Sequence, residues 1–136
     1  RNKGTPLRMG ELAELSLAPF ARGAARAHVE GDEVAIPPQT AGALGLVLHE
    51  LATNAVKHGA LSVMSGSVRL SWRHDGDRLH LTWRESGGPH VSAPVHRGFG
   101  SVLIQQSIPY ELGGSVTLDF APGGVECTIT CPLASA

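Results

Sequence analysis

The sequence has few aromatic residues, few cysteines and no long apolar run. Only 4% of its 136 residues are aromatic, and two are cysteine. The longest apolar stretch, 41–48, is far below the ~20 residues that a transmembrane helix requires. The basic start of the sequence also lacks the apolar core of a signal peptide. We therefore expect a soluble, cytoplasmic domain that makes no direct contact with a membrane.

The two cysteines are not placed to form a disulfide. Cys127 and Cys131 lie four residues apart in an expected strand, so their Cα atoms are about 13 Å apart at ~3.3 Å per residue. A disulfide requires a Cα separation below about 7 Å. No further pair of cysteines or histidines completes a usual zinc pattern. We expect two buried, reduced thiols.

Net charge is also low, since the formal value at pH 7 is −1. A protein without a broad positive field is a poor binder of nucleic acid, so no nucleic-acid partner is expected. The hydrophobic fraction of 42% and the charged fraction of 17% are typical of a globular protein. The length fits one core, and we expect a single domain over residues 1–136.

Helical and strand-like patterns are mixed along the chain. Apolar residues recur at helical spacing in three segments: 7–17, the segment that follows Pro37-Pro38 and stops at Gly59, and 101–112. Strand patterns occur in three pairs: 27–29 with 33–36, 67–73 with 78–84, and 116–120 with 125–131. The turns between paired strands contain glycine, and Gly31 is expected to supply a positive φ.

This order of elements predicts an α/β (α+β) two-layer sandwich. A mixed, largely antiparallel sheet would be covered on one face by about three helices. A doubly wound parallel fold would need strands and helices that alternate throughout, which is not the pattern here.

The central predicted helix carries a polar stripe beside its apolar one. Glu50, Asn54 and either Lys57 or His58 follow at i, i+4 and i+7 or i+8. Two interpretations remain open from spacing alone. The stripe is either a solvated helix face, or a carboxylate, a carboxamide and a cation that hold a hydrated magnesium ion and its phosphates.

The segment 49–61, HELATNAVKHGAL, resembles the N-box of the GHKL ATPase superfamily, and specifically of the HWE histidine kinases. The resemblance implies that Asn54 coordinates Mg²⁺ and that Glu50 positions or polarises the reacting group. Lys57 would contact phosphate oxygens, and His58 would either neighbour a phosphate or cap the helix end. His49 is the hallmark of the family and not its phosphoacceptor.

Trp83-Arg84-Glu85 resembles the Trp-x-Glu sequence that opens the G1 box of the same family. Because side chains alternate along a strand, Glu85 shares the face of an otherwise core-facing row. The family role would be to accept a hydrogen bond from the adenine amine, which would satisfy a buried carboxylate, while Gly87 lets the base approach the backbone. Trp83 is expected to pack in the core, as is Trp72.

Gly98-Phe99-Gly100-Ser101 precedes a predicted helix, a setting that favours anion binding by backbone N–H groups. It resembles the G2 box, which follows the phosphates and hinges the lid over ATP. The lid would be the short stretch 88–97, in which Arg97 is a candidate for a phosphate contact. Val102 stands where the family often has arginine, so a contact of that arginine with a phosphate or with a partner is not expected here.

The resemblance extends from about Leu7 to Leu133. It implies the Bergerat fold, the cofactors ATP and Mg²⁺, and transfer of the γ-phosphate to a histidine on a separate dimerisation domain absent from this sequence. A response regulator would receive the phosphate.

Two other functions stay open. One is a degenerate, non-ATP-binding domain that docks a response regulator. The other is a GHKL relative of a different class, either a serine kinase or an ATP-driven clamp.

Overall fold

A computed structural model describes residues 7–19, 26–89, 99–121 and 124–133. The helices are α1 (Met9–Leu17), α2 (Pro38–His58), α3 (Phe99–Leu112) and the short 3₁₀ helix η1 (Ala60–Ser62). The strands are β1 (Leu7–Arg8), β2 (Ala27–Gly31), β3 (Ala35–Ile36), β4 (Ser67–Asp75), β5 (Arg78–Ser86), β6 (Ser115–Ala121) and β7 (Gly124–Pro132).

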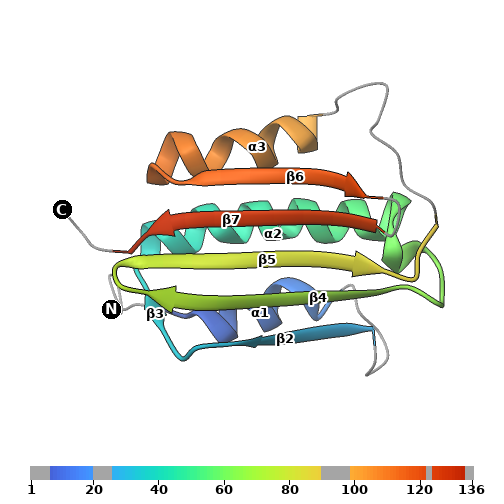
Figure 1. Cartoon of the computed structure of the whole chain (residues 1–136), viewed down its shortest axis with the longest axis horizontal. Helices are drawn as coiled ribbons and strands as arrows, with labels where there is room; N and C mark the ends of the chain where they lie inside the picture. The colour runs from blue at the N-terminus through green and yellow to red at the C-terminus, as the bar shows by residue number, and fades with distance from the viewer. Residues whose placement is uncertain (1–6, 20–25, 90–98, 122–123, 134–136) are drawn as a thin grey trace.

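Five strands form one sheet in the order β2-β4-β5-β7-β6, and β1 pairs with β3 separately. Within the larger sheet only β2 and β4 are parallel, and the other neighbours are antiparallel. The helices lie on one face of this sheet, with α2 behind its middle strands (Figure 1). The structure confirms the predicted two-layer sandwich with a mixed, largely antiparallel sheet.

The core lies between the sheet and the helices. Alternation along β4 and β5 directs Val68, Leu70 and Trp72 of one strand, and Leu81 and Trp83 of the other, toward the helices. All five side chains are buried, which confirms the expected core positions of both tryptophans. The opposite face carries polar pairs such as Arg84 with Glu126, and the described helices lie on one face alone.

Helix α2 is the central element of the helical layer. Its sequence begins with a proline at the first helical turn, where no backbone N–H is needed. Leu44, Leu48, Leu51 and Ala55 form its buried stripe. It packs against both α1 and α3. Within the part of the chain that the structure describes, no helix has the length and apolar character needed to cross a membrane.

The prediction of a turn at Gly31 was wrong. Strand β2 pairs with β4, and β3 pairs with β1, so the two segments do not form a hairpin. The φ angle of Gly31 is not positive. Glycine is required there because an added Cβ would lie 2.3 Å from the indole ring of Trp72. The first helix also begins at Met9, because Leu7 and Arg8 belong to β1.

Other predicted turns are confirmed. Gly76 has a φ of 63° in the Asp-Gly turn between β4 and β5. Gly113, with a φ of 72°, ends α3.

Cys127 and Cys131 are both buried, free thiols in β7, as expected from the sequence. Burial raises the pKa of Cys127 to about 12 and that of Cys131 to about 11, so both stay protonated at neutral pH.

Candidate functional site

The carboxylate of Glu85 lies at the junction of two elements. Glu85 is next to the last residue of β5 and faces the helices, where its side chain is only 4% exposed. Its Oε1 accepts a hydrogen bond from the backbone N–H of Ala60 at 2.9 Å, directly after α2. Its Oε2 accepts one from Nε1 of Trp83 at 3.0 Å. Both oxygens of the carboxylate therefore have a protein partner, whereas the sequence analysis identified only the adenine amine as a partner.

The environment of Glu85 alters its ionisation. Burial raises the pKa of the carboxyl above its usual value of 4.5, whereas the hydrogen bonds from Ala60 and Trp83 act in the opposite direction. An ionised carboxylate offers about four lone pairs, and the two protein donors occupy two of them. Glu85 therefore has acceptor capacity left for a donor on a ligand.

Gly59 ends α2 and makes room for Glu85. Its φ of −113° is ordinary for any residue, so a left-handed turn is not the reason for glycine here. An added Cβ would lie 2.3 Å from Oε1 of Glu85 and 3.1 Å from Cα of Ala55. The end of the helix and the end of the strand are thus in direct contact.

Glycines also surround the exit from β5. Gly87 has a φ of 73°, and an added Cβ would lie 2.4 Å from the carbonyl oxygen of Ser65. An added Cβ on Gly88 would lie 2.6 Å from Cα of Ala60. The backbone needs glycine at 87 for its conformation and its packing, which is a reason independent of any ligand. The role of Gly87 in admitting a base remains a prediction.

The predicted polar stripe of Glu50, Asn54 and Lys57 or His58 lies in the C-terminal half of α2, which ends next to Glu85. Ala43 and Val47 precede Glu50 and Asn54 in one helical row; the first two are buried, and the latter two are partly exposed. Lys57 and His58 in the last turn are exposed. Asn54 lies four residues before His58, the last residue of α2, which is about 6 Å along the helix axis at 1.5 Å per residue.

The direction of Asn54 follows from helical geometry. A Cβ on Gly45 would lie 3.6 Å from Cδ1 of Leu12 in α1. Asn54 comes nine residues later, which is two and a half turns of a helix with 3.6 residues per turn. Asn54 therefore projects away from α1, on the side of α2 that faces α3.

Some predicted site residues lie outside the described residues: Arg97, Gly98 and nearly all of the predicted lid. Gly100 and Ser101 belong to the first turn of α3, which begins at Phe99, two residues earlier than predicted. The N–H groups of a first helical turn have no partner within the helix. The proposed contact of this turn with phosphates remains a prediction.

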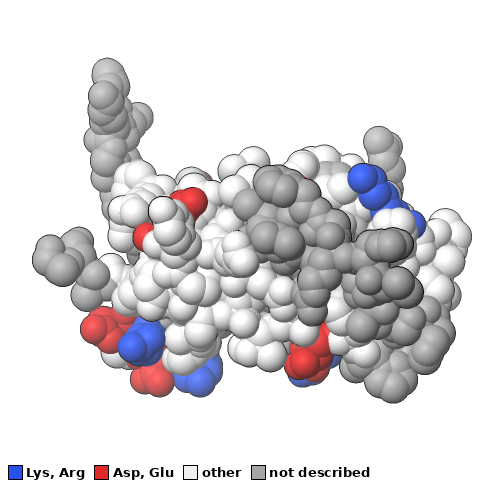
Figure 2. All heavy atoms as spheres, turned by 90° about the horizontal axis from the view of Figure 1, so that it is seen from above, with Lys and Arg blue, Asp and Glu red and all other residues white. Residues whose placement is uncertain are grey.

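Charge near these elements is local. Seen from the α3–β6 side, the described surface carries few acidic or basic atoms, and these gather at its borders (Figure 2). Lys57 and His58 supply basic groups in the last turn of α2. Among the described residues, a phosphate bound there would meet these individual cations.

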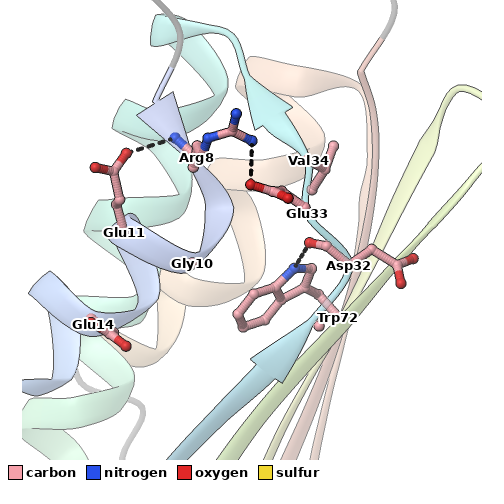
Figure 3. Close-up of a pocket in the computed structure, with 9 residues that line it drawn as sticks. Arg8, Gly10, Glu11, Glu14, Asp32, Glu33, Val34 and Trp72 are labelled. Atoms are coloured by element: carbon pink, nitrogen blue, oxygen red, sulfur yellow. Dashed lines mark hydrogen bonds and ion pairs between the residues drawn. The ribbon is translucent and has the colours of Figure 1, made fainter.

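A hollow of about 350 Å³ lies elsewhere, between α1 and the connection from β2 to β3 (Figure 3). Trp72 at its wall pairs with Leu81, about 13 Å along the strands from Glu85 at ~3.3 Å per residue. Arg8 pairs with Glu33 at 3.1 Å, and Nε1 of Trp72 donates to the carbonyl oxygen of Asp32 at 2.8 Å. None of the predicted site residues lines this hollow.

Sequence reasoning missed the partners of Glu85. The i, i+2 spacing of Trp83 and Glu85 on one strand face is a local signal that could have revealed their contact. The N–H of Ala60 has no such signal, because 25 residues separate it from Glu85.

The family model described as "Histidine kinase-like ATPase domain" matches residues 12–106. The blue-light-activated histidine kinase 1 of Erythrobacter litoralis is 49% identical over 117 residues, which are 82% of this chain and 32% of that protein. That of Brucella anthropi is 37% identical over 138 residues, which are 98% of this chain and 28% of that protein. The chain thus spans about a third of the length of these relatives.

Solved structures of histidine kinase domains are also similar to this chain. The histidine kinase domain of an Erythrobacter litoralis blue-light-activated histidine kinase has a TM-score of 0.73 and 28% identity, over 91% of this chain and 58% of that one. The nucleotide-free catalytic domain of the histidine kinase ThkA has a TM-score of 0.77 over 98% of this chain and 99% of that one, and at 16% identity it shows the fold alone. The chain belongs to the histidine kinase-like ATPase domain family, which implies ATP binding.

Proposed function

We propose that this chain is the ATP-binding catalytic domain of a two-component sensor histidine kinase of the HWE type. It holds magnesium-ATP and presents the γ-phosphate to a histidine on a separate dimerisation domain. We also propose that residues 1–136 form this one domain, and that the phosphoacceptor and sensor domains belong to other parts of the full-length kinase.

One observation carries the proposal: the hydrogen bond from Ala60 to Glu85 brings the end of β5 against the end of α2. The base-recognition candidate then lies at the end of α2, and the phosphate-side candidates Lys57, Asn54 and Glu50 follow within the last two to three turns of the same helix. A single nucleotide could reach both groups, which two unconnected surfaces would not allow.

The residues at the stripe fit a magnesium ion that is shared with a nucleotide. Within residues 7–19, 26–89, 99–121 and 124–133, no group of three or more His, Cys, Asp or Glu side chains could hold a metal by itself. Magnesium in nucleotide sites uses one or two protein oxygens together with phosphate oxygens and waters. The Asn54 carboxamide oxygen is a suitable ligand of this kind, with Glu50 one turn away.

The protein contributes mainly positioning and charge neutralisation, because phosphoryl transfer needs little covalent help. Glu85 accepts a hydrogen bond from the adenine amine and so fixes the base. Lys57 contacts phosphate oxygens, joined by His58, by Arg97 and Gly98 of the lid, and by the first turn of α3 at Gly100 and Ser101. Bound magnesium would neutralise phosphate charge at Asn54. Glu50 positions the reacting group beside the γ-phosphate.

The proposed partners are the dimerisation and phosphoacceptor domain of the same kinase, and a response regulator that takes the phosphate from it. Neither nucleic acid nor a membrane is a proposed partner of this domain. We propose a cytoplasmic location, where ATP and response regulators occur.

Titration calorimetry with magnesium-ATP tests this function. The wild-type chain is expected to bind ATP in a magnesium-dependent manner. Asn54→Ala should weaken binding about tenfold or more, because it removes the only proposed protein ligand of the metal, and a hydrogen bond or ligand contact to a charged group contributes about 1.5–3 kcal/mol.

Thr53→Ala is the matched control. Thr53 is the adjacent residue of α2, and its hydroxyl donates to the carbonyl oxygen of His49 within the same helix. This variant should bind magnesium-ATP like the wild type. A wild-type chain that shows no magnesium-dependent binding would contradict the proposal and favour a degenerate docking domain.

A further inference from the structure

The two tryptophans of the sequence occupy comparable positions with different partners. Both are buried, at 8% exposure for Trp72 and 1% for Trp83, and both face the helices from neighbouring strands. The indole N–H of Trp72 donates to a backbone carbonyl, whereas that of Trp83 donates to the Glu85 carboxylate. Only Trp83 is thus linked to the base-recognition candidate.

A second donor holds the other oxygen of Glu85, and the loop that carries this donor is itself clamped. The guanidinium of Arg26 donates to the carbonyl oxygens of Gly66, Ala60 and Val63. Arg26 therefore ties the segment 60–66 together from outside it. Because Ala60 is in this segment, its N–H is held in place against Oε1 of Glu85.

The arrangement fixes the plane of the carboxylate. A glutamate side chain has three rotatable bonds and loses rotamer freedom when it binds a ligand in one geometry. Two donors, one on each oxygen, remove that freedom before a ligand arrives. They also leave one lone pair of each oxygen free in a defined direction, which is what recognition of a single amine requires.

We infer that Trp83 and Arg26 are positioning residues for purine recognition, and that they act through Glu85. This inference rests on the proposed function, because it assigns to Glu85 the 6-amino group of adenine. Trp83 orients the carboxylate directly. Arg26 orients it through the loop that presents the N–H of Ala60.

The test compares two nucleotides on four proteins: the wild type and the variants Trp83→Phe, Trp72→Phe and Arg26→Met. Affinity is measured for magnesium-ATP and for the magnesium complex of purine riboside triphosphate, in which hydrogen replaces the 6-amino group. The wild type should prefer ATP by roughly tenfold or more, because a buried acceptor is left without its partner when the amine is missing. Trp83→Phe should weaken ATP binding about tenfold and leave the analogue nearly unaffected, so that the preference is largely lost.

Trp72→Phe is the matched control, since it also deletes an indole N–H from a buried ring on the same sheet face. It should retain the preference for ATP. Arg26→Met should reduce the preference as Trp83→Phe does. If Trp83→Phe keeps the wild-type preference, the positioning role is wrong although the proposed function stands. If the wild type binds neither nucleotide, the proposed function itself fails.

A measurement on the wild type covers the case in which Trp83→Phe does not fold. The ¹⁵N spectrum should contain two indole signals, one per tryptophan. Magnesium-ATP should shift the signal of Trp83 and not that of Trp72, while magnesium tripolyphosphate, which has no base, should shift neither. An unmoved Trp83 signal at saturating ATP would overturn the inference.

Discussion

At the scale of single residues, Glu85 shows how burial and hydrogen bonding oppose each other. Its exposure of 4% disfavours the charged form, and its two donors favour it. The net result is a pKa above the usual value. A carboxyl whose pKa is higher in the folded than in the unfolded chain gives a stability contribution that is present at low pH and lost as pH rises.

Glu85→Gln should remove this dependence. The wild-type free energy of unfolding contains a Glu85 contribution that is fully present below about pH 4.5 and disappears as pH rises through the raised pKa. The stability of the wild type relative to the variant should therefore fall as pH increases. Urea denaturation of both proteins from pH 4 to pH 8 measures the difference.

Glu126→Gln is the control for this prediction, because Glu126 pairs with Arg84 on the open face of the sheet and is much more exposed than Glu85. Its difference from the wild type should not follow the Glu85 curve. If the wild type and Glu85→Gln showed parallel dependence on pH, the raised pKa of Glu85 would be wrong.

At the scale of elements, the contact between the end of α2 and the end of β5 sets the geometry of the site. Gly59 is the residue on which this contact depends, because any side chain would occupy the space of Oε1 of Glu85. The sequence predicts a helix end at Gly59. The physical reason for glycine at this position is the room that it leaves for Glu85, 26 positions later, and this reason is visible only in the folded chain.

Gly59→Ala should destabilise the domain by about 1–3 kcal/mol, because its Cβ would lie 2.3 Å from a buried oxygen. It should also weaken ATP binding by displacing the Glu85 carboxylate. Gly42→Ala, in the same helix and with nothing within 4 Å of its Cβ, should instead stabilise the domain by about 0.5–1 kcal/mol. Chemical denaturation of both variants tests the pair, and equal effects would contradict this account of Gly59.

Elements with strong periodicity could be predicted from sequence, and long-range pairings could not. The apolar stripe of α2 and the alternation in β4 and β5 result from local burial patterns, so their existence is readable. Strand β1 has two residues and pairs with β3, which lies 27 or more positions away. No local pattern distinguishes this two-residue strand from the start of a helix. In the same way, no local pattern shows that Gly31 belongs to a strand and not to a turn.

At the scale of the whole molecule, the sheet order brings together residues that are far apart in sequence. Strands β4, β5 and β7 are adjacent, and α2 lies behind β5 and β7 (Figure 1). The family resemblance supplied the candidate site residues, which stay predictions, and alternation correctly predicted which face Glu85 occupies. The donors on Glu85 and the clamp by Arg26 depend on tertiary packing, which is why only the structure revealed them.

The central claim is that one nucleotide occupies both ends of this site. A crystal structure of the chain with magnesium and a non-hydrolysable ATP analogue tests it most directly. The adenine amine should lie within hydrogen-bond distance of the Glu85 carboxylate, while the metal and phosphates of the same nucleotide should contact Asn54. A nucleotide that contacts only one of these residues, or that binds at another surface, would contradict it.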